Sequence, residues 1–198
     1  MYYSPVPARG DHDARRRDVS EAVWRVLATR GFGGLTIRAV AAALGSSTGL
    51  VSHYFPSKRA LVRYAHDIAE ERSANRARHT PPAPGRPALR AALLDVLPLT
   101  PESVAMSRAW VSFWDAALGD AELGRSQTAR YARWRGRLRE HVEAARERGE
   151  LPPDTDLDDL VATAAAFAHG LVVQALFDPD RFPPDRQIRL LDAFMNSL

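Results

Sequence analysis

Residues 36–58 read TIRAVAAALGSSTGLVSHYFPSK, and this stretch predicts two short helices joined by a tight turn. Thr36 is a residue type that caps helix N-termini, and apolar residues follow it at helical spacing: Ile37, Val40, Ala41 and Leu44. Gly45 stands where a helix ends in the left-handed conformation, which glycine adopts without strain. Ser47 can then cap a second helix over about Thr48 to Tyr54. The stretch therefore predicts a helix-turn-helix.

The second helix of this pair divides into an apolar side and an outer side of small or hydrogen-bonding residues. We expect Leu50 and Val51 to face the core, leaving the outer side to Thr48, Gly49, Ser52 and His53. Small and hydrogen-bonding side chains suit contacts with base edges in a DNA major groove. Any corner between two helices shows part of this pattern, so an ordinary helical corner is the alternative.

Residues 48–58 also contain the pattern T-G-x-x-x-x-Y-F-x-x-K. This pattern resembles the DNA-binding domain of TetR-type one-component regulators, with its fixed positions at Thr48, Gly49, Tyr54, Phe55 and Lys58. The variant S-T-G-L-V-S-H-Y-F is similar in particular to the BetI-type, choline-responsive branch. The resemblance is strong over residues 31–64 and moderate over 100–180, where A-W-V-S-F-W-D-A-A-L-G-D and L-F-D-P occur. Ser46 departs from the family, which usually has an apolar residue there.

The resemblance implies a homodimeric, sequence-specific transcriptional regulator, a repressor that a small molecule releases from double-stranded operator DNA. It implies base contacts from Arg38, Thr48, Gly49, Ser52 and His53. It implies phosphate contacts from Thr36, Tyr54 and Lys58. In such regulators a ligand in the C-terminal domain moves the fourth helix and changes the spacing of the two DNA-binding heads. The alternative is a small-molecule- or partner-binding protein of the same fold that has lost operator binding.

Charge and composition agree with a DNA-binding head on a separate body. Residues 1–80 carry 13 Arg and Lys against 7 Asp and Glu, a net charge of +6, whereas residues 81–198 carry 14 against 17, a net −3. A basic N-terminal part fits a polyanion-binding surface, with chance scatter of charge as the alternative. The chain has no Cys, no signal-like N-terminus and no uninterrupted apolar run of about 20 residues. We therefore expect a cytoplasmic protein without a membrane partner.

Helical periodicity and breakers predict an all-α protein of about nine helices in two domains. Residues 1–12 are interpreted as a flexible tail and residues 13–78 as the DNA-binding domain. Its first helix spans 13–30, and its long fourth helix follows Ser57 to Arg78. Residues 79–87 hold four prolines and form the linker. Residues 88–198 form the ligand-binding and dimerisation domain, with helices over 88–97, 101–118, 120–148, 156–178 and 184–198.

The last two helices predict the contact between two copies. Residues 160–177 are apolar nearly all round, and small residues recur at Ala162, Ala165, Ala168 and Gly170. The final helix is amphipathic. A helix without a polar face must be covered on both sides, so we expect a four-helix contact in a homodimer. Burial of both helices inside one monomer is the alternative.

Aromatic residues on two adjacent predicted helices suggest the ligand site. Trp110, Phe113 and Trp114 fall on one helix, Tyr131 and Trp134 on the next, and His169 can add a polar group from a third. Ring faces attract quaternary ammonium groups, and the BetI-type resemblance also points to a choline-like or other cationic effector. Plain hydrophobic core is the alternative for each of these residues.

Catalytic and metal chemistry find no support in the chain. Asp154, Asp156 and Asp158 start like a calcium loop, but Asp159 and Ala165 replace the glycine and glutamate that the loop requires. We expect these aspartates to stabilise a helix N-terminus instead. The sequence contains no nucleophile elbow, phosphate loop or dinucleotide glycine pattern. It predicts no enzyme, no cofactor and no metal.

Overall fold

A computed structural model describes residues 9–81 and 83–198, and within these ranges the chain forms nine α-helices and no β-strand. The predicted all-α class and helix number are confirmed. The chain divides into two compact units, residues 1–75 and 76–198, which are described separately below.

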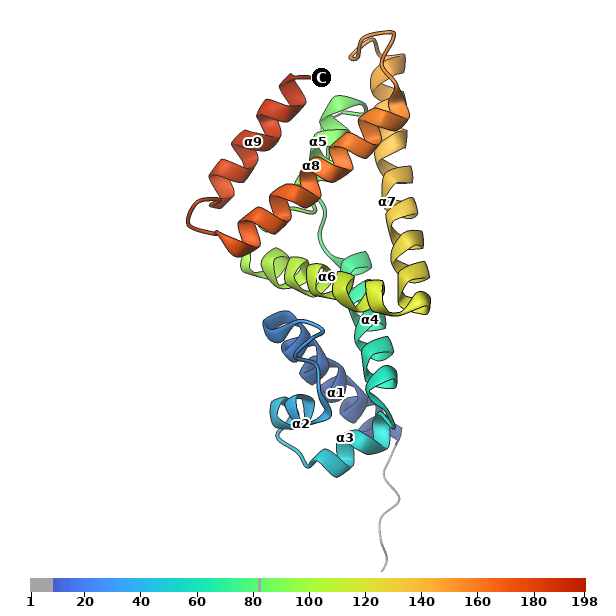
Figure 1. The fold of residues 1–198 in the computed structure, drawn as a ribbon, viewed down its shortest axis with the longest axis vertical. Helices are drawn as coiled ribbons and strands as arrows, with labels where there is room; N and C mark the ends of the chain where they lie inside the picture. The colour runs from blue at the N-terminus through green and yellow to red at the C-terminus, as the bar shows by residue number, and fades with distance from the viewer. Residues whose placement is uncertain (1–8, 82) are drawn as a thin grey trace, which may run out of the picture. The chain divides into compact units, whose positions relative to one another are not determined.

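Unit 1 contains α1 (Arg9–Arg30), α2 (Ile37–Leu44), α3 (Thr48–Tyr54) and α4 (Lys58–Asn75). Helix α1 packs against α2 and α4, and α2 packs against α3 (Figure 1). Large residues from all four helices and their loops are fully enclosed: Val23, Leu27, Leu35, Val51 and Leu61. This small core holds α3 on the outside of the unit.

The ends of α1 and α4 differ from the predicted ones. Helix α1 begins at Arg9, four residues before the predicted start, while residues 1–8 of the predicted tail lie outside the described residues. The apolar stripe of α1 begins only at Val19, so periodicity could not detect its polar first turns. Helix α4 ends at Asn75, and the next residues, Arg76 to Arg78, belong to unit 2. These arginines and Ala77 carry no apolar stripe to mark the end.

Unit 2 contains α5 (Arg86–Leu94), α6 (Pro101–Gly119), α7 (Ala121–Glu147), α8 (Leu157–Phe177) and α9 (Pro184–Asn196). Helix α7 packs against α5, α6 and α8, and α9 packs against α5 and α8 (Figure 1). The shared core is mainly aliphatic and includes Leu93, Leu138, Val142, Ala164, Ala168 and Leu191. The helices follow the predicted ranges to within three residues at each end.

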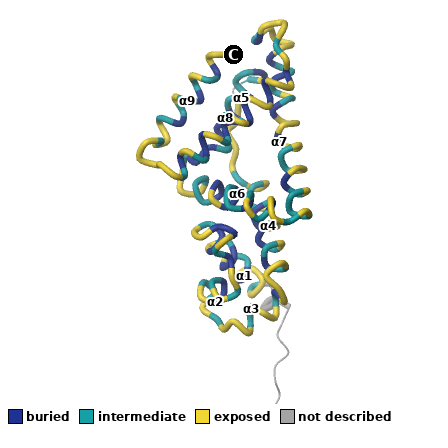
Figure 2. The backbone as a smooth tube through the Cα atoms, viewed as in Figure 1, coloured by how far each residue is buried: buried dark blue, intermediate teal, exposed yellow. Residues whose placement is uncertain are grey.

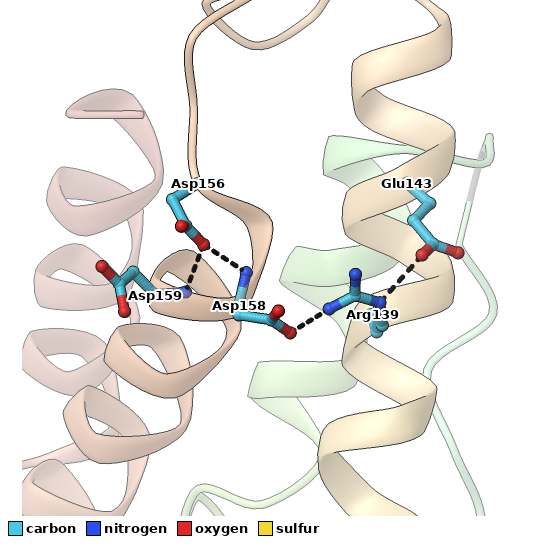
Figure 3. Close-up of polar contacts among 5 residues, drawn as sticks. All are labelled: Arg139, Glu143, Asp156, Asp158 and Asp159. Carbon is cyan, nitrogen blue, oxygen red and sulfur yellow. Dashed lines mark hydrogen bonds and ion pairs between the residues drawn. The ribbon is translucent and has the colours of Figure 1, made fainter.

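The aspartates before α8 act as predicted, as helix-capping groups (Figure 3). Asp156 Oδ1 accepts hydrogen bonds from the backbone N–H groups of Asp158 and Asp159 at 2.9 and 3.0 Å. The Asp158 carboxylate pairs with Arg139, whose Nε also donates to Glu143 Oε1 at 2.9 Å. These carboxylates therefore fix the start of α8 and tie it to α7.

Helix α8 is covered on one side only within the chain. Ala164, Ala165, Ala168 and Leu171 lie in the core of unit 2, whereas Ala162, Ala166, Gly170 and Phe177 are exposed. The sequence had grouped Ala165 and Ala168 with the dimer-contact residues; both face the chain's own core instead. By length and composition alone α8 could cross a membrane. A core helix of a soluble bundle passes the same test, and α8 contacts all four other helices of unit 2.

Candidate nucleic-acid interface and effector site

The turn between α2 and α3 has the predicted caps at both ends. Thr36 Oγ1 accepts a hydrogen bond from Ala39 N at 3.1 Å and begins α2. Gly45 ends α2 at φ 69° and ψ 33°, and Ser46 N donates to Ala41 O at 3.0 Å. Ser47 Oγ then accepts from Leu50 N at 3.3 Å and begins α3. The left-handed conformation at Gly45 is what turns the chain sharply enough for α3 to cross α2.

Helix α3 buries one side and exposes the other (Figure 2). Val51 is fully enclosed and Leu50 is half-buried, while the exposed side consists of Thr48, Gly49, Ser52 and His53. At Gly49 an added Cβ would meet only Ser47 Oγ, at an ordinary 3.8 Å. The fold therefore does not require glycine at this position, and the space outside it is open.

The other predicted DNA-contacting residues surround α3. Thr36, Arg38 and Lys58 are exposed at the starts of α2 and α4, and Tyr54 is half-buried at the end of α3. Tyr54 lies between neighbouring rings, 6.0 Å from His53 and 6.5 Å from Phe55 between centroids. Ser57 fixes the start of α4, because its Oγ accepts from Ala60 N at 3.1 Å. Unit 1 thus brings all eight predicted residues to α3 and its flanking turns.

In unit 2, four of the six predicted ligand residues meet around His169 on α8. Its ring centroid lies 4.7 Å from that of Trp134, 5.1 Å from Tyr131 and 5.7 Å from Trp114. The other two residues, Trp110 and Phe113, form an edge-to-face pair at 5.9 Å. Phe113 is fully buried, so it serves as core. We call Trp110, Trp114, Tyr131, Trp134 and His169 the aromatic cluster.

Arg130 belongs to this cluster, although the sequence analysis did not single it out. Its guanidinium carbon lies 3.5 Å from the centroid of the Trp110 ring. Arg130 precedes Tyr131 and stands one helical turn before Trp134, and this spacing was the signal that could have found it. One arginine of α7 therefore already covers a tryptophan face on α6.

The cluster favours neutral side chains. Burial, followed by the charges of Arg130 and Arg135, lowers the pKa of His169 from 6.5 to about 4. Burial also raises the pKa of Tyr131, against a hydrogen bond from Gln127 and the charge of Arg130. None of the described residues hydrogen-bonds a ring nitrogen of His169. At neutral pH His169 is therefore an uncharged imidazole with donor and acceptor both available.

The sequence matches two family models. Residues 20–65 match the model of bacterial regulatory proteins of the tetR family, and residues 84–198 match the C-terminal domain of BetI-type transcriptional repressors. The chain belongs to the TetR family of bacterial transcriptional regulators. This regulator therefore combines a sequence-specific DNA-binding domain with a ligand-binding domain of BetI type.

Individual relatives agree. The regulator is 26% identical to the HTH-type transcriptional regulator PksA of Bacillus subtilis, over 98% of this chain and 94% of that protein. It is 28% identical to BetI of Burkholderia cenocepacia, over 84% of each chain. Its fold matches a transcriptional regulator from Saccharomonospora viridis, solved in complex with choline, with a TM-score of 0.77 and 22% identity over 93% and 96% of the two chains. These relatives are transcriptional regulators, and none of these comparisons indicates catalysis.

Proposed function

We propose that this regulator is a homodimeric repressor in the cytoplasm that releases its operator when a small molecule binds unit 2. The observation that carries the proposal is the exposed side of α3, held outward by the capped turn at Gly45. The match of unit 2 to BetI-type repressors supports the sign of regulation.

In the operator complex, α3 enters the major groove. Arg38, Ser52 and His53 contact base edges together with Thr48, and Gly49 allows the DNA close to the helix. Thr36, Tyr54 and Lys58 contact phosphates and fix the register of the helix on the duplex. Thr36 can cap α2 through its oxygen lone pair and still donate its hydroxyl hydrogen to a phosphate.

The second copy covers the outer sides of α8 and α9. Exposed residues recur along α8 about one helical turn apart, at Ala162, Ala166, Gly170, Gln174 and Phe177. Phe177 is 78% exposed, which is unusual for so large an apolar side chain. Beside this stripe, Phe167 stacks on Phe194 of α9 at 4.6 Å. Small residues let two copies of α8 approach closely, and two-fold symmetry pairs the same surfaces.

The dimer makes release by a ligand simple. Two copies of α3 reach successive major grooves only when they stand about 34–36 Å apart. An effector at the aromatic cluster that moves the heads away from this spacing breaks one half-site. Affinity then falls because half of the phosphate and base contacts are lost.

Binding of the purified protein to the DNA upstream of its own coding region tests the proposal. We expect saturable binding of one dimer by fluorescence anisotropy, resistant to excess unrelated DNA and weakened as salt rises. Replacing Ser52 and His53 together by alanine should abolish the preference for that DNA. Equal affinity for the upstream region and unrelated DNA would instead favour a ligand-binding protein without an operator.

A further inference from the structure

The aromatic cluster holds its own occupants at the places where an aromatic box would hold a ligand cation. Three rings, from Trp114, Tyr131 and Trp134, each contact the imidazole of His169. The face of the remaining ring, Trp110, carries the guanidinium of Arg130 at 3.5 Å. Since cation–π attraction acts through a ring face within about 6 Å, Arg130 already uses this face of Trp110.

Charges around the cluster are of one sign. Arg130 and Arg135 both act on His169, and the same two arginines act on Tyr131. No acidic side chain is among the groups that act on either residue. Among the described residues, no three His, Asp or Glu side chains gather where they could hold a metal ion. A quaternary ammonium ligand would therefore meet repulsion here without a carboxylate to offset it.

We infer that the effector is a small organic anion with a flat apolar body, such as an aromatic carboxylate, and that Arg130 binds its negative group. This inference names the ligand class for the effector role proposed above and rests on that proposal. The planar guanidinium has five N–H donors, so it can stack on Trp110 and still bind a carboxylate through its edge. The rings around His169 suit a flat body, and the neutral imidazole can donate one further hydrogen bond.

Gln127 extends the recognition to the polar end of the ligand body. Its side chain is buried one turn before Tyr131, and its Oε1 accepts no hydrogen bond from the described residues. A buried acceptor without a donor costs about 1–3 kcal/mol. A hydroxyl or N–H group on the ligand can satisfy this oxygen, so a hydroxy-substituted aromatic acid fits the site better than a plain one.

Three probes that share a phenol ring and differ in charge test the inference: 4-hydroxybenzoate, 4-hydroxybenzamide and (4-hydroxybenzyl)trimethylammonium. Calorimetric titration of the full-length protein measures each affinity. We expect the carboxylate to bind roughly tenfold or more tighter than the amide, and the ammonium compound most weakly. Arg130→Gln should weaken the carboxylate roughly tenfold, change the amide little and strengthen the ammonium compound, because it frees the Trp110 face.

Arg125→Gln is the matched control, since Arg125 is an exposed arginine of α7 five residues earlier. It should leave all three affinities unchanged. The inference is overturned if the ammonium probe binds the wild type most tightly, if Arg130→Gln leaves carboxylate binding unchanged, or if the carboxylate does not bind at millimolar concentration. Operator release, measured in parallel, separates the two proposals. Release by the cation alone keeps the repressor and rejects the anionic effector, whereas Arg130-dependent anion binding without release does the reverse.

Discussion

Ser20 Oγ and the Tyr64 hydroxyl lie 2.6 Å apart and join α1 to α4 within unit 1. This hydrogen bond is part-buried, and the ring of Tyr64 also packs on Phe55 at 5.0 Å between centroids. It therefore helps to fix the helix that follows α3 relative to the first helix. The pair belongs to the scaffold that holds the DNA-contacting surface.

Tyr64→Phe should lower the free energy of unfolding by about 1 kcal/mol, because it removes this hydrogen bond and leaves the ring contact intact. Urea denaturation monitored by circular dichroism measures the change. Ser20→Ala should cost a similar amount, and the double variant should cost little more than either single one. Additive losses would show that the two hydroxyls do not interact in solution.

Lys58→Ala should weaken binding to specific and unrelated DNA by the same factor. The exposed ammonium group at the start of α4 contacts a phosphate in the proposed complex, so its loss lowers the slope of log affinity against log salt by about one unit. Anisotropy titrations at several salt concentrations measure this slope. Arg38→Ala and His53→Ala should instead change which operator bases matter. Unaltered operator affinity in all three folded variants would exclude this surface from the DNA interface.

Gly49→Ala should stabilise the fold and weaken operator binding. Alanine fits at this position without a clash and favours helix over glycine by about 0.5–1 kcal/mol. The added methyl group projects toward the DNA in the proposed complex. Gly45→Ala is the contrasting variant, because Gly45 has φ 69° and alanine there is strained. Thermal melting and operator titration should therefore separate the two glycines, and full operator affinity in Gly49→Ala would contradict the docking of α3.

Ala166→Glu should give a folded monomer, whereas Ala168→Glu should prevent folding of unit 2. Ala166 lies on the exposed side of α8, and Ala168 is fully enclosed in the core of its own chain. A carboxylate buried without a partner costs several kcal/mol at either place, but only Ala166 is buried by the second copy. Light scattering after gel filtration measures the mass. Ala132→Glu, on an exposed position of α7, is the control and should remain dimeric. A dimeric Ala166→Glu variant would place the contact elsewhere.

Acidification should destabilise unit 2 through His169. Its pKa is lowered from 6.5 to about 4 in the folded chain, so between these values the unfolded chain binds the proton and the folded chain does not. Stability therefore falls as pH falls through this window, by up to roughly 3 kcal/mol. His169→Gln should remove this part of the pH dependence while leaving that of the carboxylates. Parallel pH profiles of the two proteins would show that the imidazole titrates normally.

The local features of the helix-turn-helix could be predicted because each depends on residues close in sequence. The caps at Thr36, Ser47 and Ser57 and the left-handed end at Gly45 are contacts within about five residues. Residue type therefore decides them. The start of α1 at Arg9 was not predicted, because its first turns carry no apolar stripe to read.

The effector cluster could be predicted only in part. Helical spacing indicated which aromatic residues share a side, and His169 does meet three of them. Spacing gave no sign that the Arg130 guanidinium would lie on Trp110, because a long flexible side chain can take many positions. That placement changes the expected ligand from a cation to an anion.

The sequence by itself determined the family, the all-α fold, the helix-turn-helix and the side of α3 that faces outward, since these follow from motifs, capping residues and periodicity. Only the tertiary structure decided which side of α8 is left for a partner. Ala166 and Ala168 are equivalent in sequence, because both are alanines in an apolar helix. The helices packed against α8 enclose Ala168 and leave Ala166 exposed. A helix that is apolar all round carries no periodic signal, so packing alone separates its two sides.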